Sequence, residues 1–214
     1  MFKTFALSCA LAAALVVASP AAALTVTPVD VTASDTFPFF GQYKAENLIN
    51  GSGLTDGLHD ANYANMWMTD LSVDEATLVF DLGQVYALTS FQVWNYNFGV
   101  EEFASTLDRA ANAFTLAISS DGVNFSQVLA GNLSRGTGGP LAAETFAFTG
   151  EARYVQLNLD GNHQRFPETY GYAPIGLSEV RFAAVPEPTT WALLIAGFGA
   201  TGAVLRRRGA ARAA

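Results

Sequence analysis

The side chains best suited to chemistry in this 214-residue chain lie together in its C-terminal third. Asn162, His163 and Arg165 stand next to Phe166. Amide, imidazole and guanidinium groups hydrogen-bond sugar hydroxyls, and an aromatic ring stacks on the CH face of a sugar. This polar and aromatic group therefore favours carbohydrate binding. A structural role is the alternative interpretation of His163.

Sequence patterns typical of catalysis are absent. The chain has no Gly-x-Ser-x-Gly motif, and its two histidines, His59 and His163, have no Ser or Cys partner at a motif spacing. Without a His and Cys cluster there is no candidate zinc site. Glu101 and Glu102 are adjacent, so on an extended loop their carboxylates point apart. We expect a protein that is not an enzyme. A small glycan hydrolase is the least favoured alternative; it stays open because a catalytic pair of carboxylates can come from residues far apart in the sequence.

Residues 1–23 have the pattern of a secretory signal peptide. Lys3 supplies the positive start, residues 5–18 are apolar, and three alanines at 21–23 form a small-residue cleavage site. The single cysteine, Cys9, lies inside this segment. The exported chain would therefore contain no disulfide.

Residues 186–214 have three parts with separate physical consequences. Pro186, Glu187 and Pro188 end the folded domain, because proline cannot continue a strand. An apolar run begins at Trp191 and is followed by Arg206, Arg207 and Arg208, which resist translocation. As a short hydrophobic helix, residues 191–205 would span about 22 Å, against a hydrocarbon core of roughly 30 Å. This length suits a temporary stop in the membrane, and a permanent single-pass anchor is the alternative.

This C-terminal segment resembles the PEP-CTERM sorting signal of Gram-negative bacteria, in its PEPxxWA form. The resemblance implies export through the inner membrane and transient anchoring there. An exosortase-type membrane peptidase would then cut near the Pro-Glu-Pro turn. The released domain would pass to the cell surface or to an extracellular matrix of exopolysaccharide.

The remaining residues, 24–185, carry six basic and eighteen acidic side chains, a net charge of about −12. A surface of this charge repels nucleic acid and anionic lipid. It suits neutral glycans, cations or simple solubility.

The same segment predicts an all-β fold. Apolar residues alternate at period two in short runs separated by Gly, Asn and Asp, and we find no helical stripe. A turn is expected at Gly83 and another at Gly122. The pattern predicts a sandwich or jelly roll. The expected strands are residues 77–82, 87–96, 113–119, 124–129, 144–148, 153–159 and 177–182.

Several motifs of this segment occur in an order that resembles the discoidin, or coagulation-factor C-type, domain. They are NLING at 47–51, Trp67, ATLVFDLGQVYALTSFQVWN at 76–95, FTLAISSDGVNF at 114–125, ARYVQLNL at 152–159 and GLSEVRF at 176–182. The resemblance implies a galactose-binding-like jelly-roll β-sandwich. This family includes family 32 carbohydrate-binding modules, and it places Trp67 in the core.

The resemblance also implies a structural Ca²⁺ site. Calcium takes six to eight oxygen ligands. Carried over by position, the ligands are Asn50, Ser52, Asn65 and Glu179, with Asn50 in place of the more usual aspartate. Asp56 and Asp60 could compensate for that lost charge. A surface strand residue or an ion pair with Arg181 is the alternative for Glu179.

Ligand binding in this family uses loops at one end of the sandwich, here residues 56–68, 95–109 and 162–173. The residues expected to bind a glycan are Tyr96, Arg109, Asn162, His163, Arg165 and Phe166. For Arg109 we favour an ion pair with Asp108 that closes the loop. The sequence thus predicts an exported carbohydrate-binding protein, with a structural matrix protein without a specific ligand as the alternative.

Overall fold

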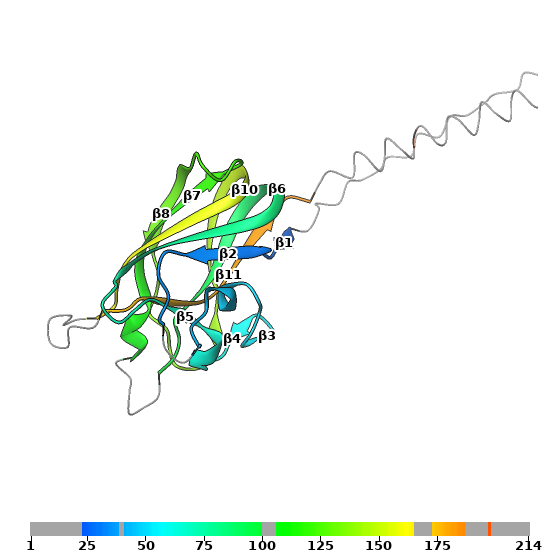
Figure 1. Cartoon of the computed structure of the whole chain (residues 1–214). Coiled ribbons are helices and arrows are strands. Elements are labelled where there is room, and N and C mark those ends of the chain that lie inside the picture. The colour runs from blue at the N-terminus through cyan, green and yellow to red at the C-terminus, as the bar shows by residue number, and fades with distance from the viewer. Residues whose placement is uncertain (1–22, 39–40, 100–105, 165–172, 187–196, 198–214) are drawn as a thin grey trace, which may run out of the picture.

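The computed structural model describes residues 23–38, 41–99, 106–164, 173–186 and 197, and these form a domain built almost wholly of antiparallel strands (Figure 1). The predicted signal peptide, apart from its last residue, lies outside the described residues, and so does nearly all of the C-terminal segment. In the part of the chain that is described, no helix is long and apolar enough to cross a membrane.

Two long strands dominate the fold, β6 (Glu75–Asn95) and β10 (Glu144–Asn162). The other strands of the main sheet are β1 (Leu24–Val26), β2 (Asp30–Ala33), β5 (Trp67–Met68), β7 (Ala111–Ser119), β8 (Ser126–Asn132) and β11 (Gly176–Ala184). A second small sheet contains β3 (Leu54–Thr55), β4 (Leu58–His59) and β9 (Leu141–Ala142). Two 3₁₀ turns, η1 (Ala45–Leu48) and η2 (Tyr63–Asn65), lie in the connections.

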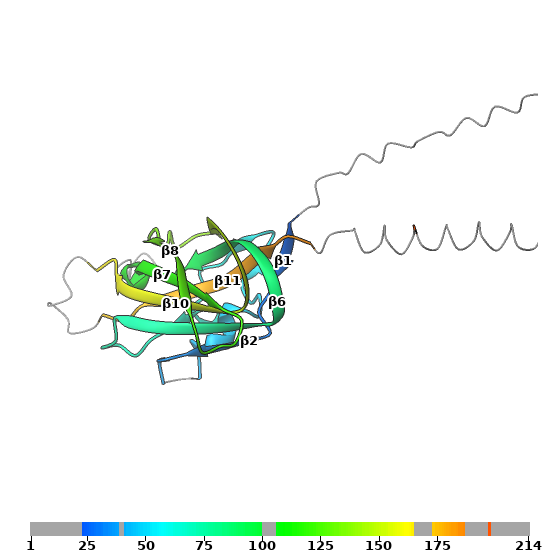
Figure 2. The ribbon, with the colours of Figure 1, turned by 90° about the horizontal axis from the view of Figure 1, so that it is seen from above.

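The main sheet folds over on itself because β6 and β10 each take part in two layers. The first half of β6 pairs with β2 and with the second half of β10, which also pairs with β7. The second half of β6 pairs with β11 and with the first half of β10. Figure 2 shows the curvature of β6 from above. The two layers form the β-sandwich that the sequence predicts.

The expected turn at Gly83 is wrong. Gly83 has a φ of 84°, and its N–H donates to Asp81 Oδ1 at 2.7 Å, but β6 continues through it. The runs 144–148 and 153–159 are likewise parts of one strand, β10. The ladder between the two long strands absorbs the bend through register shifts at 147–150 and 152–154. A glycine that signals a turn here marks a bend within a strand.

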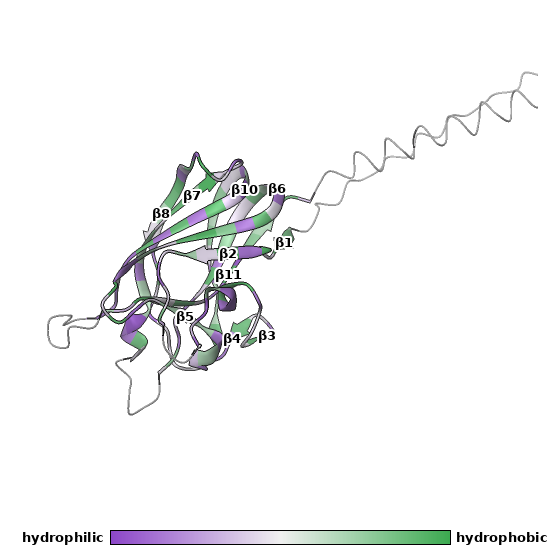
Figure 3. Ribbon diagram, in the orientation of Figure 1, coloured by the Kyte–Doolittle hydropathy of each residue, from purple (hydrophilic) through white to green (hydrophobic). Residues whose placement is uncertain are grey.

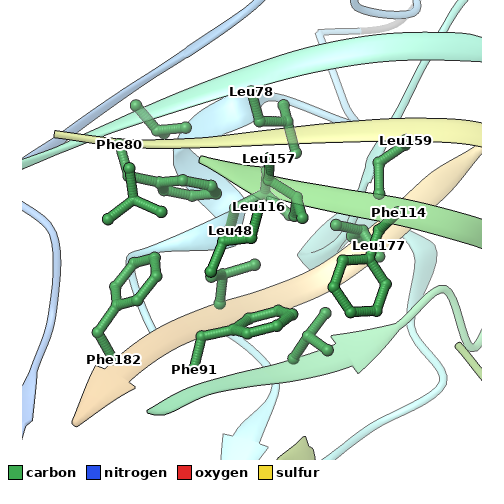
Figure 4. Close-up of a cluster of buried hydrophobic side chains, with 14 of the residues drawn as sticks. Leu48, Leu78, Phe80, Phe91, Phe114, Leu116, Leu157, Leu159, Leu177 and Phe182 are labelled. Carbon is green, nitrogen blue, oxygen red and sulfur yellow. The ribbon is translucent and has the colours of Figure 1, made fainter. Parts of the chain in front are cut away.

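The core fills the space between the layers. Apolar and polar residues alternate along β6 and β10 (Figure 3), so one face of each strand points inward. Figure 4 shows the resulting cluster, in which Phe80 meets Phe182 and Phe91 meets Phe114, with ring centroids 5.7 Å and 5.3 Å apart.

Trp67 is a core residue, as predicted. Its side chain has 0% exposure, and its indole N–H donates to Asp35 O at 3.2 Å and to Thr36 Oγ1 at 3.1 Å. This bond ties the segment after β2 to the sandwich.

Strand β11 connects the two ends of the domain. Its last residue, Ala184, pairs with Leu24 of β1, whereas its first residue, Gly176, pairs with Met68 of β5. Nine residues of strand separate these points by about 27 Å. Both chain ends of the domain therefore lie at one end of the sandwich, and β5 with its loops lies at the other.

Candidate ligand pocket at the loop end

A pocket of about 480 Å³ opens at the end of the sandwich that is remote from the chain ends. It lies beside Met68 of β5, the strand near the loops in Figure 1. Four aromatic rings, two further apolar side chains, a glutamine and an arginine line it. The lining residues are Phe37, Gln42, Tyr43, Tyr63, Met68, Leu71, Phe98 and Arg109.

Tyr43 is the centre of the aromatic wall. Its ring lies 5.7 Å from Phe37 in an edge-to-face contact and 5.9 Å from Tyr63, by ring centroids. Tyr63 in turn meets Phe98 edge-to-face at 5.2 Å. Beneath this layer, Tyr96 stacks on Tyr43 at 6.4 Å. These contacts join three segments that are far apart in the sequence.

The backbone at Tyr43 is held in an uncommon conformation. Its φ is 58°, in the left-handed region that residues with a side chain rarely adopt. Gly41, two residues earlier, has a φ of 60°. Such strain costs on the order of 1–3 kcal/mol and persists only where the surroundings impose it, often at binding sites. Here it places the Tyr43 ring in the pocket wall.

Arg109 reaches the pocket from a tightly held turn. Residues 106–109 form one 3₁₀ turn, and Leu107 within it is buried. The buried side chain of Asn95 fixes the next strand, because it accepts from Ala111 N–H at 3.0 Å and donates to Ala111 O at 2.8 Å. From this base the Arg109 guanidinium lies 3.8 Å from the sulfur of Met68.

The expected ion pair between Asp108 and Arg109 is wrong. Asp108 pairs instead with Arg135, which approaches from the connection after β8. The two neighbouring side chains therefore point to different partners, as adjacent residues at the end of a turn often do.

Tyr96 does not offer a surface for stacking, contrary to its prediction as a loop residue that binds a glycan. Its side chain has 0% exposure, and its hydroxyl has no partner at hydrogen-bond geometry. Burial raises the pKa of the Tyr96 hydroxyl well above its usual range, and the neighbouring Tyr43 acts in the same direction. Burial also raises the pKa of Tyr43. Both phenols thus stay neutral beside Arg109.

Of the other predicted ligand residues, Asn162 and His163 do not line this pocket. Asn162 donates to Pro174 O at 3.0 Å, and His163 Nε2 is hydrogen-bonded to Leu133 O at 3.0 Å. His163 N–H also donates to Asp108 O. These contacts join three loops to one another. Arg165 and Phe166 lie outside the described residues.

Sequence reasoning missed half of the residues that line the pocket, although it named Arg109 as a ligand residue. Tyr63 and Phe98 were within the candidate loops, but Phe37, Gln42 and Tyr43 precede them in a segment without a predicted role. A signal was present in the aromatic run Phe-Pro-Phe-Phe at 37–40, which comes just before Tyr43. Polar connections with so many aromatic residues are typical of binding surfaces.

The residues predicted to bind calcium gather around one turn, residues 50–53. Gly51 N–H donates to Glu179 Oε2 at 3.1 Å, and Ser52 N–H donates to Asn50 Oδ1 at 2.8 Å. On the other side of the turn, a Cβ on Gly53 would lie 2.9 Å from Asn65 Nδ2.

The oxygen atoms around this turn fit a calcium ion in part. Ser52 Oγ is buried and has no hydrogen-bond partner, and Glu179 brings a carboxylate with 0% exposure. Arg181 also donates to Glu179, at 3.1 Å. Among the described residues, no three His, Cys, Asp or Glu side chains converge. A calcium ion would therefore need backbone and amide oxygens besides Glu179.

Glu179 has an unusual proton affinity. Burial raises its pKa to about 7, although the Arg181 guanidinium and the Gly51 N–H act in the opposite direction. The carboxyl is consequently near its titration midpoint at neutral pH.

Comparisons with known families agree with this architecture. The chain matches the F5/8 type C domain over residues 30–170 and the PEP-CTERM protein-sorting motif over residues 184–208. The protein therefore belongs to the F5/8 type C domain family and carries a motif that indicates export and sorting to the cell surface. Both resemblances that the sequence suggested are confirmed. None of the curated proteins compared with the chain matches it significantly.

Solved structures of carbohydrate-binding modules share the fold. A truncated AlyQ with CBM32 and alginate lyase domains is 20% identical with a TM-score of 0.53, and the match covers 79% of this chain but 35% of that one. The module CpGH89CBM32-5 from Clostridium perfringens, in complex with GalNAc-β-1,3-galactose, is 19% identical with a TM-score of 0.52, over 72% of this chain and 93% of that one. The family 32 module of C. perfringens NanJ, in complex with galactose, is 14% identical with a TM-score of 0.54, over 76% and 99%. The chain thus spans about a third of the first structure and nearly all of the other two, and the likeness shows a common galactose-binding-like fold.

Proposed function

We propose that this protein is an exported, non-catalytic carbohydrate-binding protein that holds a glycan in the pocket at the loop end. The observation that carries the proposal is the composition of that pocket, in which aromatic rings surround one amide and one guanidinium. Sugar sites need apolar faces for CH groups and a few placed polar groups for hydroxyls. The ligands of the family 32 modules that share the fold support the same class of ligand.

The position of the pocket suits a protein fixed by its C-terminal end. The chain leaves the sandwich after Ala184, at the end where β1 and β11 pair, and the sorting motif begins there. The pocket lies at the opposite end, beside β5. A domain held at the envelope through its tail would present the pocket outward, toward exopolysaccharide. We propose an exosortase-type peptidase as the enzyme that processes the tail.

We also propose that Ca²⁺ binds at the turn formed by residues 50–53. Support comes from the buried carboxylate of Glu179 and from the buried, unpartnered Ser52 Oγ at this turn. Asn50 and Asn65 would add amide oxygens. The ion would supply only structural cross-linking, between the turn and β11.

The binding proposal can be tested with two aromatic variants. Tyr63 and Phe98 are half-buried in the pocket wall. We expect the parent protein to bind a sugar or host exopolysaccharide with micromolar to millimolar affinity, roughly −8 to −4 kcal/mol. Tyr63→Ala and Phe98→Ala should each weaken binding about tenfold, because each removes a stacking surface. Isothermal titration against a monosaccharide panel and the polysaccharide measures this.

Tyr154→Ala is the matched control. Tyr154 is also a half-buried tyrosine, but it lies on β10, where Arg153 covers its ring at 4.9 Å. Its loss should leave affinity unchanged. Equal binding by the parent and both pocket variants would show that the pocket is not the site. If no glycan binds the parent protein, a structural matrix protein becomes the better description.

A further inference from the structure

Arg109 is a cation without an acidic partner in the part of the chain that the structure describes. Asp108, its neighbour, pairs with Arg135, and the contact of the Arg109 guanidinium is with the Met68 sulfur. The other described arginines with ion pairs are Arg153, with Asp81, and Arg181, with Glu179. Arg109 thus differs from them in having its charge uncompensated.

None of the described residues that line the pocket supplies a charge that would compensate Arg109. The remaining residues that line the pocket are aromatic or apolar except for the neutral amide of Gln42. The Tyr43 and Tyr96 hydroxyls lie close to the guanidinium, and burial raises the pKa of both, so neither becomes a phenolate at neutral pH. The described lining of the pocket therefore carries one positive charge, within a domain whose net charge is about −12.

This arrangement indicates that the pocket is suited to a ligand with a negative charge. A charge between aromatic rings is screened less than one in open water, so its attraction for an anion is stronger. The guanidinium presents a planar set of donors that matches a carboxylate through two parallel hydrogen bonds. The rings beside it provide the apolar surface for the sugar that bears the carboxylate.

We propose that the pocket takes an acidic sugar, with the carboxylate of a uronic acid residue on Arg109 and its ring against Tyr63 and Phe98. This proposal rests on the proposed function and names the class of glycan. An acidic ligand is not the one that the net charge of the domain suggests, because that charge is negative and favours neutral glycans or cations. The charge of Arg109 at the site has the opposite sign. One carboxylate at a single arginine is a short-range contact that overall repulsion does not prevent.

The test compares sugars that differ only at the carboxyl position. Galacturonic acid is titrated beside galactose, glucuronic acid beside glucose, and the methyl ester of galacturonic acid serves as an uncharged isostere. We expect each acid to bind the full chain at least about tenfold more tightly than its neutral counterpart, and the ester to bind like the neutral sugar. The ester arm uses the parent protein, so it does not depend on the folding of any variant.

Two variants of Arg109 complete the experiment. Arg109→Gln should abolish the preference, so that each acid and its neutral counterpart bind this variant alike, whereas Arg109→Lys should retain part of the preference, since it keeps the charge but not the planar donors. Arg153→Gln, which removes an arginine far from the pocket, should retain the full preference.

The outcomes separate the two proposals. If acids and neutral sugars bind equally, or if Arg109→Gln keeps the preference, the acidic-sugar inference is overturned while glycan binding stands. If neither class of sugar binds, the proposed function fails, and the acidic-sugar inference fails with it because it depends on glycan binding.

Discussion

At the residue scale, Glu179 combines complete burial with only two donors. Its carboxylate accepts from the Gly51 N–H and from Arg181, and it lies where the resemblance to the family expects a calcium ligand. Removing a carboxylate from water disfavours its charged form. A guanidinium and one backbone N–H offset this cost only in part, which is why the pKa of Glu179 is raised to about 7.

This pKa predicts how stability depends on pH. The carboxyl has an ordinary pKa of 4.5 and a pKa of about 7 in the folded protein. Between these values the folded state binds more protons than the unfolded state, so the free energy of unfolding falls as the pH rises through this window. We expect the Tm of the calcium-free protein to fall between about pH 5 and pH 8, measured by calorimetry. Glu179→Gln should remove this part of the fall, and the exposed Glu151→Gln should not.

Calcium should reverse the loss at high pH, because it binds the ionised carboxylate. At a hundred times its dissociation constant, a ligand of the native state adds about 2.7 kcal/mol. Excess Ca²⁺ should therefore raise the Tm at pH 8 but have little effect at pH 5, and Glu179→Gln should abolish the rise. The calcium proposal fails if the Tm at pH 8 is the same in calcium and in chelator. Arg181 would then be the charged partner of Glu179 in place of a calcium ion.

At the element scale, the buried side chain of Asn97 holds the centre of the connection between β8 and β9 against the sandwich. Asn97 accepts from the N–H groups of Thr137 and Gly138, both at 2.9 Å. It donates to Gly139 O at 2.6 Å and to Asp60 O at 3.2 Å. The glycine-rich connection after β8 is therefore anchored at its centre.

We expect Asn97→Ala to destabilise the protein by about 3 kcal/mol, because several buried backbone groups would lose their partner. Asn97→Asp should be as damaging, since a carboxylate cannot donate to Gly139 O. Chemical denaturation measures the free energy of unfolding, and hydrogen exchange at the Thr137 and Gly138 amides reports the anchoring directly. Asn124→Ala, on an exposed turn, is the matched control. Unchanged exchange in Asn97→Ala would show that the backbone alone holds this connection.

At the scale of the whole molecule, the candidate pocket and the chain ends of the domain lie at opposite ends of the sandwich. Pairing of β1 with β11 brings the two chain ends together, and the strand ends beside β5 carry the pocket. Removal of the segments before and after the domain would therefore leave the pocket untouched. The predicted processing and the predicted binding are independent.

Processing can be followed by mass spectrometry of the protein from its native host. We expect an N-terminus near Leu24 and loss of the residues after Pro188. Replacement of Pro186, Glu187 and Pro188 by alanine should prevent the C-terminal cut and leave the hydrophobic segment in place. An intact chain that ends at Ala214 in the mature envelope fraction of the parent strain would contradict the prediction.

The sequence by itself determined the features that depend on neighbours along the chain. Side chains of a strand alternate between its two faces, so the period-two pattern indicated the main strands and their inward residues, such as Leu78 and Phe80. The sorting motif is likewise a linear pattern, and the segment 184–208 was recognisable without a fold. The order of motifs along the chain also indicated the family.

Only the tertiary structure decided which loops meet. Tyr43, Tyr63, Phe98 and Arg109 come from three connections, and how these meet depends on how β6 and β10 bend through two layers. The same folding pairs Asp108 with Arg135, leaves Arg109 without an ion pair to any described residue, and buries Tyr96. The physical reason is that hydrophobic periodicity specifies which face of a strand is buried, whereas contacts between loops depend on distances that no local pattern encodes.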